Sequence, residues 1–353
     1  MLLVTGGNRS RHAAVIQPWE GRIVGHVAIG GEPTVDDAIR GARVAVASAA
    51  DVVVAIGGGS VIDGAKAIAA LARNDGEPLE HLEVVGRGLP LAHDPLPVIA
   101  VPTTGGTGAE VTRNAVLGSP SHRVKASLRS PRMLPRVALV DPLLSLTQPR
   151  ALTAASGMDA LIQLLEPFVC MRANPIADGF CREGLSRVGR ALPRVCDVGD
   201  DLAARTEMAL CSLLGGLALA NAGLGAVHGF AGPLGGMFPA PHGALCAALV
   251  APVTRANLVA LRARGDAGGK LDRYAEAARL LLDSAKATSD DLVAWLVDLT
   301  GALEIPSLAE HGILEAAFDE IVAKASRASS MKANPVVLTE AELRGILGEA
   351  CRG

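Results

Sequence analysis

The chain has 353 residues, half of them hydrophobic, and its formal net charge is only −3. It therefore has no basic excess for nucleic acid and no acidic tail, and its length favours two domains over one core. Aromatic residues make up 2% of the chain, which argues against stacking platforms for bases or sugars.

The cysteines and the apolar segments favour a cytoplasmic protein without a membrane partner. No two of the six cysteines form a CxxC pair, which indicates reduced, mostly buried thiols. The apolar part of MLLVTGGNRS is too short for a signal peptide. The run over residues 208–230 is interrupted by glycines, Asn221 and His228, and it predicts a buried helix that runs into a loop.

Strand and helix patterns alternate in the first half of the chain. A helix over 34–50 begins at Thr34, which two aspartates follow. Residues 118–129 are predicted to be a loop. The pattern predicts an α/β domain over 1–150 whose sheet is doubly wound and mostly parallel, with ligands at the carboxyl ends of the strands. The predicted strands are 2–4, 22–29, 51–56, 97–101 and 137–140.

A glycine-rich loop, Gly57, Gly58, Gly59 and Ser60, joins the strand over 51–56 to a helical pattern. Glycine amides and a helix N-terminus suit an anion such as phosphate. Asp63 and Lys66 lie on the first turns of that helix. The alternative is a tight strand-to-helix turn without a ligand.

A second loop of small residues follows the strand over 97–101. Its glycines alternate with the hydroxyl groups of Thr103, Thr104 and Thr107. Hydroxyl groups together with glycine amides suit a pyrophosphate or a ribose. Two phosphate-type loops, each after a strand of the parallel type, are far less expected by chance than one and favour a phosphate-containing ligand at this end of the sheet.

Residues 151–353 are expected to form an all-helical domain, because helical periodicity replaces the strand pattern after Pro149. The predicted helices are 151–169, 175–195, 202–222, 274–282, 289–303, 313–328 and 340–350.

The segment Gly223–Gly243 carries two histidines, His228 and His242, on either side of a Gly/Pro-rich turn. Imidazole is the commonest metal ligand and a proton carrier near neutral pH, although both rings could also be satisfied core histidines. Asp159 and Gln163 share one face of an apolar helix. Asp159 is either a helix N-cap or a metal ligand together with the two histidines.

Taken together, these motifs resemble the iron-activated (group III) alcohol dehydrogenases, including the maleylacetate reductases. The resemblance covers nearly the whole chain, and the architecture is also similar to that of dehydroquinate synthase. The matching segments are GGGSxxDxxKxxA at 57–69, PTTxGTGAEVT at 102–112, DP at 141–142, the helix over 154–166, HG…PHG at 228–243 and NP at 334–335.

The resemblance implies a role for each of the matching residues. The glycine loop would wrap the pyrophosphate of NAD or NADP, Asp63 would lie near the nicotinamide, and Lys125 would reach the nicotinamide ribose. Thr103, Thr104 and Thr107 would hold phosphate and ribose. Asp159, His228 and His242 would occupy three of the four positions of the family's metal ligands, for one Fe or Zn ion.

Three departures from the family pattern bear on the site. Gln163 stands where the family has its fourth ligand, a histidine, and an amide oxygen is a weaker ligand than imidazole. Gly232 replaces a histidine that is a frequent proton-relay candidate. Gly6 replaces the acidic residue of many NAD-specific members, so with Asn8 and Arg9 nearby NADP(H) is also expected to be accepted.

These features predict an oxidoreductase that transfers a hydride between NAD(P)H and a small aldehyde, ketone or oxo-acid. Without a metal, His228 or His242 would have to donate the proton. Two alternatives stay open, a non-redox cyclase or lyase of the dehydroquinate synthase type and a nucleotide-binding relative that has lost catalysis. A high apolar share and an exposed first strand favour a homodimer.

Overall fold

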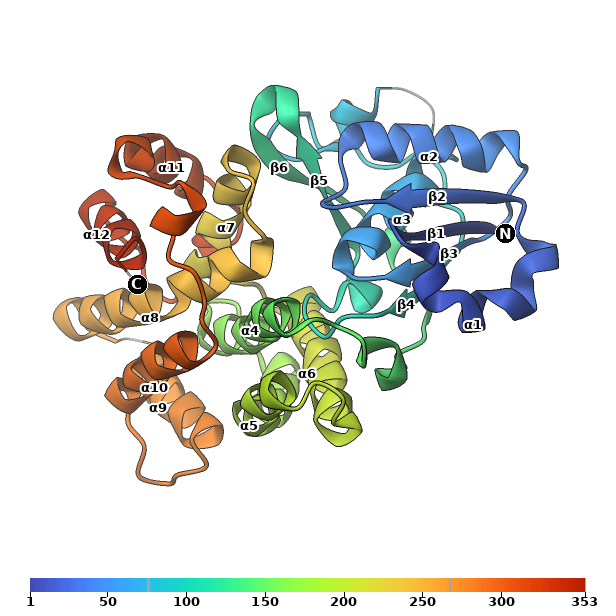
Figure 1. Cartoon of the computed structure of the whole chain (residues 1–353). Helices are drawn as coiled ribbons and strands as arrows, with labels where there is room; N and C mark the ends of the chain where they lie inside the picture. Colours follow the sequence, from blue (N-terminus) through green and yellow to red (C-terminus); the bar gives the residue numbers. More distant parts are fainter. Residues whose placement is uncertain (75–76, 267, 353) are drawn as a thin grey trace. The chain divides into compact units, whose positions relative to one another are not determined.

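The computed structural model describes residues 1–74, 77–266 and 268–352, and it divides the chain into two compact units (Figure 1). We call Met1–Thr104 with Gly108–Ser145 the sheet unit. Gly105–Thr107 with Leu146–Gly353 form the helical unit. The sequence predicts the boundary at residue 150, whereas the units divide after Ser145 and a short piece of the loop after residue 104 belongs to the helical unit.

The sheet unit contains a parallel five-stranded sheet in the order β2-β1-β3-β4-β7 and a separate antiparallel pair, β5 with β6. Its strands and helices are β1 Leu2–Gly6, α1 Ala13–Ile16, β2 Gly25–Ile29, α2 Val35–Ala47, β3 Val53–Gly57, α3 Gly59–Leu71, β4 Val98–Pro102, β5 Asn114–Ser119, β6 Val124–Arg129 and β7 Val137–Ala138.

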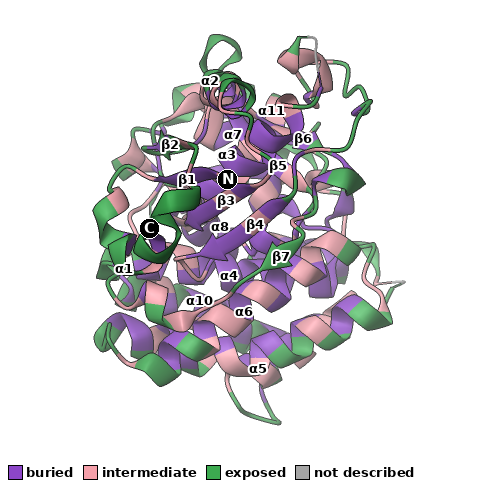
Figure 2. Cartoon of the chain, turned by 90° about the vertical axis from the view of Figure 1, so that its right-hand side faces the viewer, coloured by how far each residue is buried: buried purple, intermediate pink, exposed green. Residues whose placement is uncertain are grey.

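The three central strands are apolar along almost their whole length, because both of their faces are covered. Figure 2 shows β1, β3 and β4 in the colour of buried residues. One face packs mainly on α3, through Ile62, Ala65 and Ile68, and α2 covers the same side. The helix α2 begins as predicted, with Thr34 and Asp37 forming a reciprocal capping box.

The first strand is not exposed, which corrects one basis for the expected dimer. Val4 of β1 pairs with Val27 of β2 on one side and with Ala55 of β3 on the other. The edges of the sheet are β2 and β7. The expectation of a homodimer therefore no longer rests on an exposed first strand.

The predicted loop over 118–129 is wrong, because β6 and the end of β5 occupy it. The two strands pair from Asn114 with Arg129 to Ser119 with Val124. Their inward side chains are small or aliphatic and pack on α3 beside Ala67 and Ala70. Arg123 closes the turn with a positive φ of 50°. A short alternating pattern that contains glycine and serine gives a weak strand signal.

The helical unit contains nine helices within its described residues, and one apolar core runs through them. They are α4 Arg150–Val169, α5 Pro175–Asp197, α6 Leu202–Asn221, α7 Ala226–Met237, α8 His242–Arg264, α9 Lys270–Leu281, α10 Ser289–Ala302, α11 Phe318–Ala325 and α12 Glu340–Ala350.

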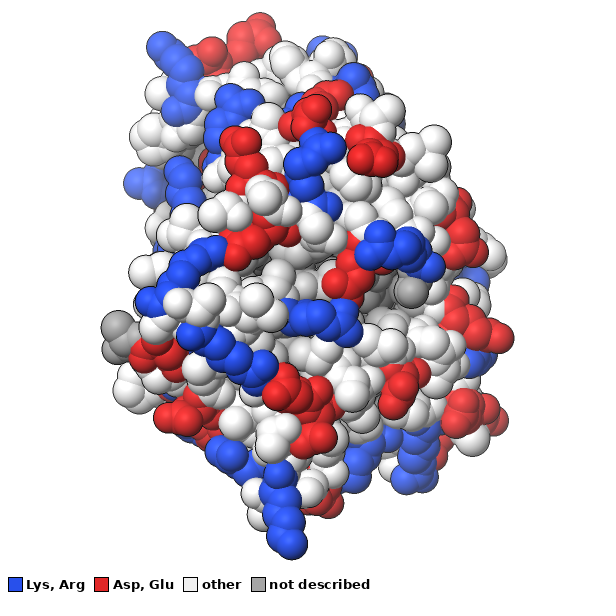
Figure 3. Space-filling model, turned by 90° about the vertical axis from the view of Figure 1, so that its left-hand side faces the viewer, with Lys and Arg blue, Asp and Glu red and all other residues white. Residues whose placement is uncertain are grey.

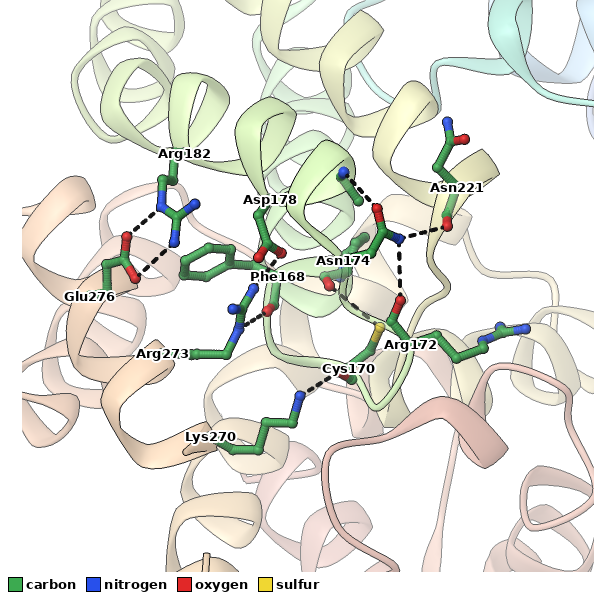
Figure 4. A network of polar contacts seen from close by, with 12 residues as sticks. Phe168, Cys170, Arg172, Asn174, Asp178, Arg182, Asn221, Lys270, Arg273 and Glu276 are labelled. Atoms are coloured by element: carbon green, nitrogen blue, oxygen red, sulfur yellow. Dashed lines mark hydrogen bonds and ion pairs between the residues drawn. The ribbon is translucent and has the colours of Figure 1, made fainter. Parts of the chain in front are cut away.

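A network of cations around an aromatic ring ties α4, α5 and α9 together (Figure 4). The guanidinium carbons of Arg182 and Arg273 lie 5.2 and 4.3 Å from the ring centroid of Phe168. Arg182 also pairs with Glu276, and Arg273 with Asp178. The ring therefore holds two cations, each of which is neutralised by its own carboxylate.

Two helices, α6 and α8, have the length and apolar composition needed to cross a membrane. In α8, 78% of the most apolar 18-residue stretch is buried inside the protein, which is typical of a core helix. On the face drawn in Figure 3, Lys and Arg alternate with Asp and Glu, so no large surface of one charge forms there.

Two glycines of α5 test how closely the helices pack. A Cβ added at Gly189 would lie 2.2 Å from the backbone oxygen of Leu281, whereas Gly179 has nothing within 4 Å. We expect Gly189→Ala to destabilise the protein by about 1–3 kcal/mol through overpacking. Gly179→Ala, the matched control, should stabilise it by up to about 1 kcal/mol. Urea unfolding measures both, and equal effects would contradict this account.

Candidate functional site

The glycine-rich loop lies at the carboxyl end of β3, where α3 begins. A Cβ added at Gly57 would lie 2.5 Å from Val61 Cγ2, and one at Gly58 would lie 3.1 Å from Thr104 Oγ1. Thr103 N donates a hydrogen bond to Gly57 O at 3.0 Å. The loops after β3 and β4 are therefore neighbours, because the two strands pair in parallel.

The order of the strands marks where a ligand of the sheet unit would bind. From β1 the chain goes to β2 on one side and then to β3 on the other, so the order reverses between β1 and β3. Ligands of open parallel sheets bind at the carboxyl ends of the strands at such a switch point. Gly6 ends β1 and Gly57 ends β3, so the expected dinucleotide loop stands at this position.

The carboxylate of Asp63 is engaged within the protein. Asp63 Oδ1 lies 2.8 Å from Lys66 Nζ, and Asp63 Oδ2 accepts a hydrogen bond from Val116 N at 3.0 Å. Lys66 is fully buried, and its ammonium group also donates to Ala109 O at 2.9 Å and to Thr112 Oγ1 at 3.1 Å. The pair joins α3 to β5, and a role of Asp63 at the nicotinamide stays a prediction.

Glu32 brings two other predicted residues of the sheet unit together. Lys125 Nζ lies 3.4 Å from Glu32 Oε1, and the hydroxyl of Ser60 donates to Glu32 Oε2 at 3.5 Å. Gly59, Thr103 and Thr104 belong to the same unit, whereas Thr107 belongs to the helical unit.

Four possible metal ligands converge in the helical unit, in a group that we call the donor cluster. It consists of Asp159 on α4, His228 on α7, and His242 and Cys246 on α8, and one ligand atom of each lies within 4.8 Å of all the others. The Nε2 atoms of His228 and His242 lie 3.2 and 4.0 Å from Asp159 Oδ1. A carboxylate, two imidazoles and a thiol suit iron or zinc.

A buried glutamate on α4 positions His228. Glu166 Oε2 lies 2.7 Å from His228 Nδ1, and Glu166 Oε1 accepts a hydrogen bond from Val227 N at 2.7 Å. The carboxylate therefore stands at the N-terminus of α7, where the helix dipole favours negative charge. A Cβ at Gly225 would lie 2.7 Å from Glu166 Oε1, so a glycine is needed for this approach.

The carboxylates set the protonation of the donor cluster. Burial by itself would lower the pKa of His228, but hydrogen bonds to Asp159 and Glu166 and their charges raise the pKa to about 10. Burial would raise the pKa of Asp159, but a hydrogen bond from His228 and the two nearby imidazoles lower it. Without a metal, His228 is therefore an imidazolium between two carboxylates at neutral pH.

Two further expectations are decided by the helices. Asp159 is not an N-cap, since α4 begins at Arg150 and Asp159 lies in its interior. The Gly/Pro-rich segment is not an extended turn, because α7 spans most of it and His242 begins α8. The side-chain nitrogen of Gln163 donates to Gly106 O at 3.1 Å, so its role as a metal ligand stays a prediction.

Two features of the site were not predicted from the sequence, the membership of Cys246 and the positioning role of Glu166. Helical spacing could have indicated both, because Cys246 follows His242 by one turn and Glu166 follows Asp159 by two turns. Because glycine and proline have low helix propensity, the segment around His228 was interpreted as a turn, and helical spacing was not applied there.

Comparisons with known proteins match both halves of the chain. The profile of the iron-containing alcohol dehydrogenases matches residues 1–142, and that of the C-terminal part of the same family matches residues 153–351. The 1,3-propanediol dehydrogenase of Klebsiella pneumoniae is 34% identical over 307 residues, 85% of this chain and 76% of the relative.

Two further proteins widen the comparison. The NAD-dependent methanol dehydrogenase of Bacillus methanolicus is 32% identical over 307 residues, 85% of this chain and 77% of the relative. The solved structure of an archaeal halo-thermophilic alcohol dehydrogenase from a Red Sea brine pool aligns with a TM-score of 0.90 at 28% identity, over 99% of this chain and 91% of the other.

The buried pair of Asp63 and Lys66 yields a stability prediction. In Asp63→Asn the ammonium of Lys66 loses its carboxylate, and the free energy of unfolding should fall by about 1–3 kcal/mol. Asp51→Asn is the matched control, since the side chain of Asp51 is 89% exposed and should contribute less than about 0.5 kcal/mol. An unchanged urea midpoint in Asp63→Asn would refute the structural role.

Glu166, which contacts Nδ1 of His228, yields a second stability prediction. Glu166→Gln removes a charge that faces the buried imidazolium, so the metal-free protein should lose about 1–3 kcal/mol of stability. Glu183→Gln makes the same change at the surface, where the carboxylate pairs with Arg187, and should cost less than about 1 kcal/mol. Urea unfolding after chelation compares the two variants, and similar losses would speak against a buried charge pair.

Proposed function

The chain belongs to the iron-containing alcohol dehydrogenases, an oxidoreductase family, and from this premise we propose that it transfers a hydride between a nicotinamide dinucleotide and a small alcohol or its carbonyl partner. The observation that carries the proposal is the convergence of Asp159, His228 and His242 in the helical unit. These residues come from three different helices. The resemblance to the family assigns each of them to a ligand position.

The residues present fit a metal ion. Asp159, His228 and His242 would hold iron or zinc, which as a Lewis acid would polarise the carbonyl oxygen of the substrate. Glu166 accepts a hydrogen bond from Nδ1 of His228 and thereby orients Nε2 of the ring toward Asp159. Such carboxylate–histidine contacts orient ligands in many metal sites.

The sheet unit supplies the groups for the dinucleotide. The backbone amides of Gly57–Ser60 at the start of α3 would receive the pyrophosphate, with Thr103 and Thr104 beside them. We place NAD first, because the guanidinium of Arg9 is engaged by both oxygens of Glu20. Gly6 offers no charge against a 2′-phosphate, so NADP is accepted as a second cofactor.

The activities of the relatives suggest the substrate class. They are dehydrogenases of 1,3-propanediol and methanol, so small primary alcohols and the matching aldehydes are our first choice. An oxo-acid substrate, as in maleylacetate reductases, comes second. A cytoplasmic location and a homodimer complete the proposal, the former favoured by the reduced, mostly buried thiols.

Two other functions make different predictions for net cofactor turnover. A cyclase or lyase of the dehydroquinate synthase type would use NAD only transiently and accumulate no NADH. A relative without catalysis would bind the dinucleotide and turn over none of the alcohols. Stoichiometric formation of NADH with an alcohol excludes both.

The central experiment removes Asp159. The wild-type protein, loaded with iron or zinc, should reduce NAD⁺ with a small primary alcohol. In Asp159→Ala the bound metal should be lost and kcat/KM should fall about 100-fold or more, since several kcal/mol of charge stabilisation disappear. Asp298→Ala, at an exposed position of α10, is the control and should keep both properties.

Two results would count against the proposal. One is an Asp159→Ala variant that keeps full activity, and the other is a wild-type protein that binds NAD⁺ and metal but oxidises no alcohol and reduces no carbonyl compound.

A further inference from the structure

The donor cluster has a fourth member that the family pattern does not include. Cys246 lies one helical turn after His242, so both side chains project from the same face of α8. Its Sγ lies 3.6 Å from His242 Nε2. Cys246 and Asp159 are almost fully buried, at 0% and 2% exposure. The geometry points to Cys246, as a thiolate, as the fourth protein ligand of the metal, in place of Gln163.

The distances between the donor atoms suit one ion. Around a tetrahedral zinc with bonds of about 2.0–2.3 Å, ligand atoms lie about 3.3–3.8 Å apart. In the donor cluster three separations between ligand atoms are 3.2, 3.6 and 4.0 Å, and none exceeds 4.8 Å. Since the separations extend to 4.8 Å, side-chain shifts of up to about 1 Å would bring the four atoms to tetrahedral spacing.

Close packing between α4 and α8 keeps the donors together. A Cβ added at Gly243 would lie 2.3 Å from Ala155 O, so the glycine after His242 lets the start of α8 lie directly on α4. The side-chain nitrogen of Gln163, in contrast, donates a hydrogen bond to Gly106 O at 3.1 Å. The helix α8 therefore supplies the donor that α4 lacks at residue 163.

Charge also favours the thiolate. Among the ligands themselves, Asp159 and a Cys246 thiolate match the two charges of a divalent ion, whereas with a neutral amide Asp159 would be the one charged ligand, and Glu166 would add its charge from behind His228. On metal binding the S–H bond breaks, an S–metal bond forms, and the proton passes to the solvent without any redox change. Since thiolate is a soft ligand, this set prefers zinc to iron.

Cobalt tests the ligand directly, because a thiolate bound to Co²⁺ gives a charge-transfer absorption in the near ultraviolet. The full-length protein is stripped with a chelator, refilled with Co²⁺ and scanned. We expect the band in the wild type and in Gln163→Ala, and no band in Cys246→Ser. Cys196→Ser controls for the loss of another buried thiol and should keep the band.

The variants also differ in metal affinity. Cys246→Ser should bind Co²⁺ about 10–100-fold more weakly than the wild type. Mutating a residue that only orients a metal ligand already costs that much affinity, and losing a ligand should cost at least as much. Cys246→Ala serves as a second variant in case the serine disturbs the fold. Circular dichroism checks that both variants are folded. After dialysis against equal Zn²⁺ and Fe²⁺ without oxygen, the zinc share should fall in both variants.

The outcomes separate this inference from the proposed function on which it rests. Cobalt bound in the wild type without the band, or a band that survives in Cys246→Ser, overturns the role of Cys246 while alcohol oxidation can stand. If the band depends on Cys246 but the protein oxidises no alcohol, the role of Cys246 as a ligand is upheld and the proposed function is refuted. No cobalt binding to the wild type overturns the ligand role outright.

Discussion

A buried chain of carboxylate, imidazole and carboxylate organises the helical unit. Asp159 and Glu166 lie two turns apart on α4, and His228 of α7 stands between them. Three ionisable groups at this depth are tolerable only because each has a partner of the opposite charge. The approach of α7 to Glu166 and of α8 to Ala155 requires glycines at 225 and 243. The motif around the histidines is thus as much a packing motif as a set of ligands.

Much of the sheet unit could be predicted because its signals are local. Short apolar runs indicated β1, β3 and β4, and Thr34 with its aspartates indicated the start of α2. The hairpin of β5 and β6 escaped, since half of its positions are small or polar and its stability comes from packing on α3. The edge positions of β2 and β7 depend on strand order, which no local pattern encodes.

The donor cluster was predictable only in part, for a different reason. Asp159, His228 and His242 stood out as polar residues in apolar surroundings. Cys246 is as apolar in pattern as its neighbours on α8, and only the folded chain shows that it faces Asp159. The helix α7 forms despite its glycines and Pro233, because tertiary contacts such as Gly229 on Met331 outweigh intrinsic propensity.

The loop Gly105–Thr107 has a consequence for dissecting the protein. Gly106 N donates to Ser212 Oγ, and Gly106 O accepts from Gln163. A fragment that starts at residue 146 would keep every helix of its unit but would lose the hydrogen bonds that Gly106 makes with these two buried side chains. Each lost hydrogen bond costs about 0.5–1.5 kcal/mol of stability. The helical unit therefore depends on residues 105–107 for part of its stability. A fragment cut after Ser145 should be less stable than the size of its apolar core suggests.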